Sequence, residues 1–188
     1  SYLKENKTKN VEEVIIGYDA RVSSPVLKRA FIEGIIDEGI DVWDVGLVTV
    51  DVIYFASGFF HSPAAIITAS HNRKEYNGFK LMRSNVDPVV IDDIKKIIDE
   101  NKSSEAEKKG TLVKKDITGE YMKHVLSFIN ADAIRPMRIA IDTNSGTVGP
   151  ILKTILEKLP IEYTAMNFSP NGEFPYHEPD PTREKNIE

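Results

Sequence analysis

An apolar run leads directly into a polar loop in the stretch AAIITASHNRKEYNGFK, residues 64–80. The run Ala64–Thr68 contains no charged side chain, and it is apolar enough to form a strand that is buried on both faces, as in parallel sheets. A polar loop after such a strand lies where open α/β sheets bind their ligands, in the crevice beyond the carboxyl ends of the strands. The stretch therefore predicts an α/β fold with a candidate site that begins near Ser70.

The sequence before this strand alternates between strand and helix patterns. The expected elements are, in chain order, a strand over Val11–Tyr18, a helix from Ser23 or Ser24 to Gly39, a strand over Ile40–Val45 and a helix over Val52–Ser57. Pro25 lies in the first turn of the first helix, where the N–H group that proline lacks has no helical partner. Alternation of this kind predicts a mixed, mostly parallel sheet with covering helices.

The sequence after the loop begins with a hairpin signal. Asn77 and Gly78 both tolerate positive φ, and Tyr76 and Phe79 flank them, which is typical of a tight two-residue turn. We expect the strand Phe79–Met82 to return antiparallel at the edge of the sheet. The further elements expected in this unit are a helix over Val89–Ile98, a charged linker over Asn101–Gly110 and a helix over Ile117–Ile129.

A second, smaller α/β unit is expected beyond Ala131–Pro136, where we place the boundary between domains 1–135 and 136–188. The elements expected there are a strand over Arg138–Asp142, a helix over Pro150–Leu159, a strand over Ile161–Phe168 and the start of a helix at Thr182. Two strands and one helix cannot bury both faces of a sheet, and isolated strand pairs are marginal in water. The second unit is therefore expected to be incomplete.

Composition narrows the class of protein. The chain of 188 residues is 41% hydrophobic, which suffices for a core, and its lack of cysteine excludes disulfides, thiolate catalysis and cysteine zinc sites. A net charge of -5 argues against a nucleic-acid partner, because phosphate-backbone binding relies on concentrated Lys and Arg. No apolar stretch approaches the length of a membrane span, and the polar start has no signal-peptide core, so we expect no membrane partner and a cytoplasmic location.

The loop after the strand is locally basic although the chain is acidic. Glu75 is the only acidic residue from Ser70 to Arg83. The cations in the same stretch are Arg73, Lys74, Lys80 and Arg83. A basic pocket around a hydroxyl suits a phosphate, so phosphoryl transfer is one interpretation and a plain polar turn is the other. A hydrolase triad is disfavoured, because adjacent serine and histidine side chains diverge on a turn and the G-x-S-x-G context is missing.

Motifs of a known family occur at five places, namely TASHN at 68–72, YNGFK at 76–80, GYDARVSS at 17–24, DVGLVT at 44–49 and NGEFPYHEPDP at 171–181. TASHN and YNGFK match the phosphoserine loop of the α-D-phosphohexomutases, which reads T-A-S-H-N-P followed by Y-N-G-F-K. This family includes phosphomannomutase and phosphoglucomutase. The chain resembles it over nearly the whole of its length.

The resemblance implies a catalytic role for three residues. Ser70 would be the phosphocarrier in a reversible transfer of phosphate between the 1- and 6-positions of a hexose phosphate, through a 1,6-bisphosphate. Mg²⁺ would bind an oxygen of the phosphate on Ser70. His71 would help with proton transfer, and Lys80 would offset the charge of the transferring phosphoryl group. Mannose and glucose phosphates are both candidate substrates.

The resemblance also implies two supporting residues. Asn72 would bind phosphate, and Arg21 would brace either the serine loop or the phosphate. An ion pair between Arg21 and Asp19 or another acidic residue is an equally open alternative for this arginine.

The chain departs from the family pattern at three places. Thr49-Val50-Asp51 stands where the family usually has T-T-P, and Asp142–Gly146 stands where it often has D-x-G-N-G. The third departure lies in the serine loop, because Arg73 stands where the family has proline. The loop therefore loses a fixed φ and gains a cation.

The family's metal loop, D-G-D-x-D-R, has no counterpart in residues 1–188. The carboxylates that would hold Mg²⁺ are therefore expected outside this chain, since hard cations need such oxygen ligands. We expect the chain to be a portion of a larger phosphohexomutase, whose remaining domains lie on further residues or on companion chains. The isolated chain is then expected to be inactive. A non-catalytic sugar-phosphate-binding or scaffold module is the alternative function.

Overall fold

The computed structural model describes residues 13–100, 106–180 and 182–186. Within these residues, six strands form one sheet in the order β5-β4-β3-β1-β2-β6. Their bounds are β1 (Glu13–Tyr18), β2 (Asp41–Leu47), β3 (Ala64–Ile67), β4 (Phe79–Arg83), β5 (Asp87–Pro88) and β6 (Leu112–Lys114). β1 pairs in parallel with β2 and β3, and β6 pairs in parallel with β2, whereas β4 and β5 are antiparallel. The predicted mixed, mostly parallel sheet is confirmed.

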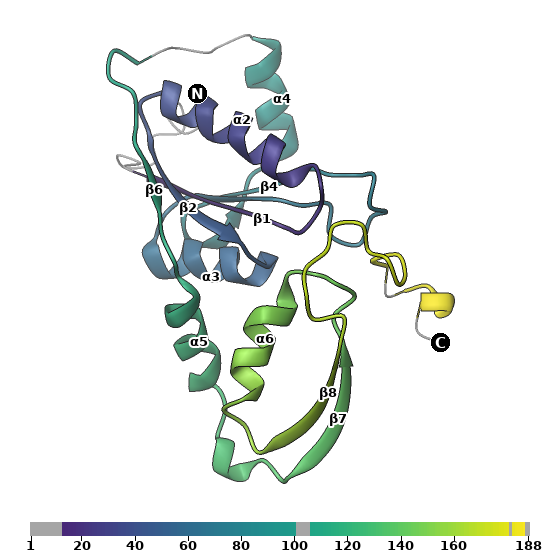
Figure 1. The fold of residues 1–188 in the computed structure, drawn as a ribbon. Helices are drawn as coiled ribbons and strands as arrows, with labels where there is room; N and C mark the ends of the chain where they lie inside the picture. The colour runs from purple at the N-terminus through teal and green to yellow at the C-terminus, as the bar shows by residue number, and fades with distance from the viewer. Residues whose placement is uncertain (1–12, 101–105, 181, 187–188) are drawn as a thin grey trace.

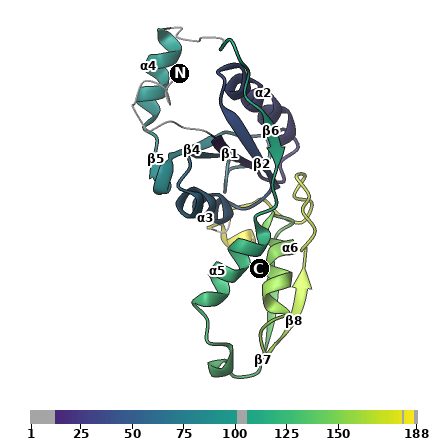
Figure 2. The same cartoon turned by 90° about the vertical axis from the view of Figure 1, so that its left-hand side faces the viewer.

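Helices cover both faces of this sheet (Figure 1). They are α2 (Ser24–Asp37), α3 (Val50–Phe60) and α4 (Ile91–Asp99). α2 and α4 lie on one face and α3 lies on the other (Figures 1 and 2). Successive side chains of a strand point to opposite faces, so each buried strand supplies both layers of the core. In β1, Val14 and Ile16 pack in the cluster beside α2, whereas Ile15 packs in the cluster beside α3.

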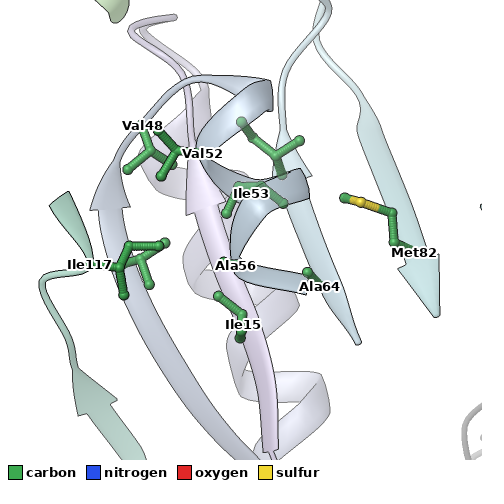
Figure 3. Close-up of a cluster of buried hydrophobic side chains, with 10 residues drawn as sticks. Ile15, Val48, Val52, Ile53, Ala56, Ala64, Met82 and Ile117 are labelled. Atoms are coloured by element: carbon green, nitrogen blue, oxygen red, sulfur yellow. The ribbon is translucent and has the colours of Figure 1, made fainter. Parts of the chain in front are cut away.

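The core on the α3 face joins residues from several elements. Figure 3 shows the side chains that gather there, among them Ile15 from β1, Ala64 from β3, Met82 from β4, Val52, Ile53 and Ala56 from α3, and Ile117 from the segment after β6. Ile15 and Ile53 are completely buried. This packing holds β1 and β3 side by side, and the polar segments 19–24 and 68–78 leave from the carboxyl ends of these two strands.

The second unit consists, within the described residues, of two parallel strands and a helix. They are β7 (Met137–Asp142), β8 (Ile161–Met166) and α6 (Val148–Leu156), which lies along one side of the strands (Figures 1 and 2). Each residue of β7 and β8 stays exposed or half-buried. α5 (Thr118–Ser127) contacts both α3 and α6 and so lies between the units. The boundary at residues 131–136, where the short turn η2 (Ala131–Ala133) lies, stays a prediction.

The tight hairpin predicted at Asn77-Gly78 is wrong. β3 and β4 do pair antiparallel, but residues 68–78 join them, and neither Asn77 nor Gly78 has positive φ. The reason is that Asn77 is used for a tertiary contact: its Nδ2 donates to the hydroxyls of Ser23 and Ser24, both at 2.9 Å. The loop is therefore wide and is closed at its base by the bond from Thr68 N–H to the carbonyl of Gly78, at 2.9 Å.

Other expectations differ from the structure at the edges of the sheet. β4 is not an edge strand, because β5 pairs along its outer side through the short turn η1 (Ser84–Val86). β6, a strand of three residues beside β2, was not expected from the sequence, since three residues are too few for an alternating pattern to be recognised.

The helix expected over Val52–Ser57 is longer in the structure. It begins at Val50 because the Thr49 side chain accepts a hydrogen bond from Val52 N–H.

Parts of three expected elements, residues 11–12, 101–105 and 187–188, lie outside the described residues. Of the helix expected from Thr182, the described residues show one 3-10 turn, η3 (Glu184–Asn186). Across the part of the chain that the structure describes, every helix is too short or too polar to cross a membrane.

Candidate active site

A cleft of about 1230 Å³ opens between the two units. It lies at the carboxyl ends of β1 and β3 on one side and of β7 and β8 on the other, which is where open parallel sheets bind ligands. The first unit lines it with Ser70, His71 and Lys80, together with residues of the turns after β1 and β2. The second unit lines it with the turn after β7 and with side chains from residues 174–179. Three of the five predicted site residues therefore share one wall of this cleft.

Ser70 has an unusual backbone conformation and a hydroxyl without a hydrogen bond among the described residues. Its φ is 52°, in the left-handed region that a serine seldom adopts. Its N–H donates to the hydroxyl of Thr68 at 2.9 Å, whereas its own Oγ is buried and has no hydrogen-bond partner among the described residues. Buried polar groups almost always have a partner, so this hydroxyl is an exception. Because the Oγ is covered, reaction there requires a rotation about χ1 or a shift of the loop that turns it into the cleft.

Arg21 explains why the loop keeps this shape. The residue is 1% exposed, and all five N–H groups of its guanidinium donate hydrogen bonds. Nε donates to Asp19 at 3.1 Å, and the terminal nitrogens donate to the carbonyls of Ser70, Asn72, Arg73 and Tyr76 at 2.7 to 3.0 Å. Both sequence-based alternatives thus occur together, since Arg21 braces the loop and also pairs with Asp19. In this conformation it has no donor left for a phosphate.

Asp19 joins the turn after β1 to the loop after β3. Its carboxylate accepts hydrogen bonds from Arg21 N–H and Nε, from Ser24 Oγ at 2.6 Å and from Thr68 Oγ1 at 2.7 Å. Thr68 in turn accepts from the N–H of Ser70. Sequence reasoning named Asp19 only as an ion-pair partner of Arg21 and Ser24 only as a helix start, and it gave Thr68 no role in the site. The available signal was that polar residues follow two buried strands, because the carboxyl ends of neighbouring parallel strands meet at one edge of a sheet.

His71, Asn72 and Lys80 are placed differently around Ser70. His71 is exposed in the cleft wall, with no hydrogen bond to any residue that the structure describes. Asn72 does not line the cleft; its side-chain N–H and backbone N–H both donate to the carbonyl of Ala69, at 3.0 Å, so it closes the loop. Lys80 lies opposite Ile66 in the β3–β4 pairing and lines the cleft, and no ion pair joins it to any described residue.

The described residues do not supply a complete set of ligands for a divalent metal. No cluster of three or more His, Cys, Asp or Glu side chains exists among them. Asp19, Asp51 and Asp142 line the cleft. Asp19 is hydrogen-bonded to the serine loop, and both of its oxygens already accept two hydrogen bonds each. Mg²⁺ needs free oxygen ligands in near-octahedral geometry, so this carboxylate is not positioned as a ready ligand.

Comparison with known proteins gives two family matches. Residues 1–108 match the model of phosphoglucomutase/phosphomannomutase alpha/beta/alpha domain I, and residues 119–188 match that of domain II. The first match ends at residue 108 and the second begins at residue 119, in the first turn of α5, whereas the boundary predicted from the sequence lies after α5.

Individual relatives agree with these matches. The chain is 35% identical over 183 residues to a phosphoglucomutase of Neisseria meningitidis serogroup B, covering 96% of this chain and 39% of the relative. It is 32% identical over 178 residues to a phosphomannomutase of Vibrio cholerae, covering 89% of this chain and 38% of the relative. It thus spans about two fifths of the length of the curated relatives.

A solved structure extends the agreement to the fold. A phosphoglucomutase/phosphomannomutase family protein from Burkholderia thailandensis superimposes with a TM-score of 0.87 at 26% identity, covering 100% of this chain and 42% of that chain. The resemblance found in the motifs is therefore confirmed by family models, by relatives and by a fold. The chain belongs to the phosphoglucomutase/phosphomannomutase family.

Proposed function

We propose that this chain forms the phosphoserine-bearing part of a phosphohexomutase, with Ser70 as the phosphocarrier. The observation that carries the proposal is the state of Ser70, whose Oγ lacks a partner among the described residues and whose φ is left-handed, in a cleft wall shared with His71 and Lys80. Strained backbone and unsatisfied polar atoms gather at functional sites. The relatives include a phosphoglucomutase and a phosphomannomutase, so glucose and mannose phosphates are the proposed substrates.

The proposed step moves one phosphoryl group between two oxygens. The bond from phosphorus to Ser70 Oγ breaks while a bond forms to a hydroxyl oxygen of the hexose monophosphate. His71 accepts the proton of the sugar hydroxyl and gives one proton to Ser70 Oγ as that oxygen leaves, so protons and charge balance. Lys80 attracts the negative charge of the phosphoryl oxygens during transfer. Return of the other phosphate of the resulting 1,6-bisphosphate to Ser70 completes the exchange.

Mg²⁺ is proposed as a cofactor because the family resemblance implies it. When bound, it would neutralise charge on the phosphate. The carboxylates to hold it would have to come from outside the described residues, on the same polypeptide or on a companion chain, and no step above is assigned to it. For this reason we expect no mutase turnover from the 188-residue chain alone.

The test uses the full-length enzyme, meaning a protein of the relatives' length that contains this chain. The enzyme is incubated with glucose 1,6-bisphosphate and Mg²⁺, and its intact mass is measured. We expect a gain of about 80 Da, one phosphate, which peptide mapping assigns to Ser70. The Ser70→Ala variant should show neither the gain nor turnover of glucose 1-phosphate.

Ser127→Ala is the matched control, because Ser127 lies on α5 and its hydroxyl donates to a backbone carbonyl outside the cleft. Near-normal turnover by Ser70→Ala would refute the phosphocarrier role. Binding of glucose 6-phosphate without any phosphorylation of the wild-type enzyme would favour the non-catalytic sugar-phosphate-binding module.

A further inference from the structure

The segment Asn171–Phe174 of the second unit rests directly on the turn that holds the serine loop. At Gly172 the backbones approach so closely that an added Cβ would lie 2.2 Å from the carbonyl oxygen of Ala20 and 2.7 Å from the N–H of Val22. Only glycine allows this approach, because any side chain would force one of the two backbones to move. The contact is therefore specific to this pair of segments.

Phe174 continues the contact over Arg21. The Phe174 ring lies 5.6 Å from the guanidinium carbon, within the range of a cation–π contact, and helps to bury the side chain that braces the serine loop. Its backbone has φ 46°, which is rare for a bulky residue and costs energy. The surrounding contacts must maintain that conformation, so the placement of this ring is constrained.

Ion pairs extend the contact to the serine loop itself. Lys74 Nζ lies 2.7 Å from Glu173, and this hydrogen bond raises the pKa of Lys74. Arg73 lies 3.8 Å from Glu178. Both pairs are largely exposed, so each contributes little by itself. Both pairs nevertheless connect the serine loop to the second unit. One of them uses Arg73, the cation at the position of the family's proline.

The segment is anchored to the second unit at its other end. Asn171 N–H donates to the carbonyl of Ser145 at 2.8 Å, and Ser145 N–H donates to the carbonyl of Asn167, also at 2.8 Å. Ser145 belongs to the turn after β7 and is buried. A continuous path of contacts thus runs from β7 and β8 through Gly172 and Phe174 to Arg21 and the loop.

We infer that Gly172 and Phe174 are positioning residues for the phosphoryl-transfer loop, acting on it through Arg21. The role in transfer rests on the proposed function, but the effect on loop conformation does not. Docking of the second unit keeps the Arg21 guanidinium on the four loop carbonyls, and those bonds keep Ser70 in its left-handed conformation. The second unit thereby completes the conformation of a site whose nucleophile lies in the first.

Hydrogen exchange of the full-length enzyme tests this inference without reference to activity. The reporters are the N–H groups of Asn72 and Tyr76, which are hydrogen-bonded within the loop. Gly172→Ala should speed their exchange about tenfold, while the N–H of Ile15 in β1 is unchanged. Gly119→Ala is the matched control, because a Cβ there meets nothing within 4 Å. Loop exchange within about twofold of wild type in a folded Gly172→Ala variant would overturn the inference.

Phe174→Leu is the second variant, because it keeps an apolar side chain but removes the ring from Arg21. If Gly172→Ala does not fold, the rate of loop exchange in Phe174→Leu decides the question, with the same twofold limit. Its maximal rate of Ser70 phosphorylation by glucose 1,6-bisphosphate should fall about tenfold while the half-saturating concentration changes less than twofold. A rise in the half-saturating concentration as large as the fall in the maximal rate would contradict a positioning role. The two proposals can also fail separately. If the loop of the variants exchanges faster but the wild-type enzyme is never phosphorylated at Ser70, loop positioning is supported and the proposed function is overturned.

Discussion

The two sheets of this molecule contain strands of equal length that lie in different environments. β1 and β7 are both six-residue strands that pair in parallel with a neighbour. Ile15 and Ile16 of β1 are completely buried, because strands flank β1 on both sides and helices cover both faces. Met137 of β7 is 46% exposed. The strand that has neighbours on both sides is thus the buried one.

The two units contribute different parts of the cleft. The first unit supplies Ser70, His71 and Lys80 from loops and strands attached to a well-packed core. The second unit supplies an opposing wall and the segment that rests on Arg21. The residues proposed to react thus lie on the better-packed unit, as expected for groups that must be held in place.

Replacing one arginine in each unit tests the difference in burial between the units and should give the largest effect. Arg21→Met removes the partner of Asp19 and of four loop carbonyls, so it should lower the free energy of unfolding by about 4 kcal/mol. Arg138→Met in β7 changes an exposed side chain and should cost less than about 0.5 kcal/mol. Urea denaturation measures both. Similar losses for the two variants would show that burial of the guanidinium does not matter.

A pair of isoleucines tests the core contrast itself. Ile15→Ala creates a cavity in the core beside α3 and should destabilise by about 3 kcal/mol. Ile139 in β7 is half-buried, so Ile139→Ala should cost about 1 kcal/mol. Denaturation followed by circular dichroism gives the two values. A cost for Ile139→Ala as large as for Ile15→Ala would mean that another part of the full-length enzyme covers β7.

Lys80 tests whether the cleft wall of the first unit acts on the phosphate. Lys80→Met in the full-length enzyme should lower kcat about 100-fold, the effect of losing one transition-state donor. Lys153→Met on α6 is the control, since this lysine is exposed on the second unit and does not line the cleft. Turnover of glucose 1-phosphate is the measurement. Unchanged turnover in Lys80→Met would leave this lysine as a solubility residue near the edge of the sheet.

The smallest effect is expected at the edge of the first sheet. Thr111 N–H and Oγ1 donate to Asp41 at 2.7 and 2.8 Å, and these bonds, the backbone one first, hold the pKa of Asp41 below its ordinary value of 3.8. A lowered carboxyl pKa stabilises the fold above the ordinary value, and this stability is lost as the pH falls through the lowered pKa.

Thr111→Val keeps the backbone bond and removes the hydroxyl, so the pKa of Asp41 should rise part of the way toward 3.8. An NMR titration of the Asp41 carboxyl between pH 2 and pH 6 measures this. The protection of β6 against hydrogen exchange should be slightly lower than in wild type at pH 7, and this difference should diminish as the pH falls through the lowered pKa of Asp41. A titration identical to wild type would mean that the hydroxyl does not contribute.

Several parts of the fold and the site were predictable because their signals are local. The apolar run before Thr68 gave a buried strand, and the helix that starts near Pro25 was marked by its first turn and by Gly39. Ser70, His71 and Lys80 were selected from one stretch of sequence, and they share one wall of the cleft. The predictions that failed, the hairpin at Asn77-Gly78 and the edge position of β4, used local rules where distant contacts decide.

The sequence by itself determined the alternation of strands and helices and the basic loop around Ser70, because periodicity and turn residues act over a few neighbouring positions. Only the tertiary structure decided what Arg21 does, since its loop partners lie about fifty residues away in the chain. The same holds for Gly172, whose requirement for glycine comes from the backbone of Ala20 and Val22. Contacts of this kind depend on which strand ends lie side by side, and that is settled only when the sheet has formed.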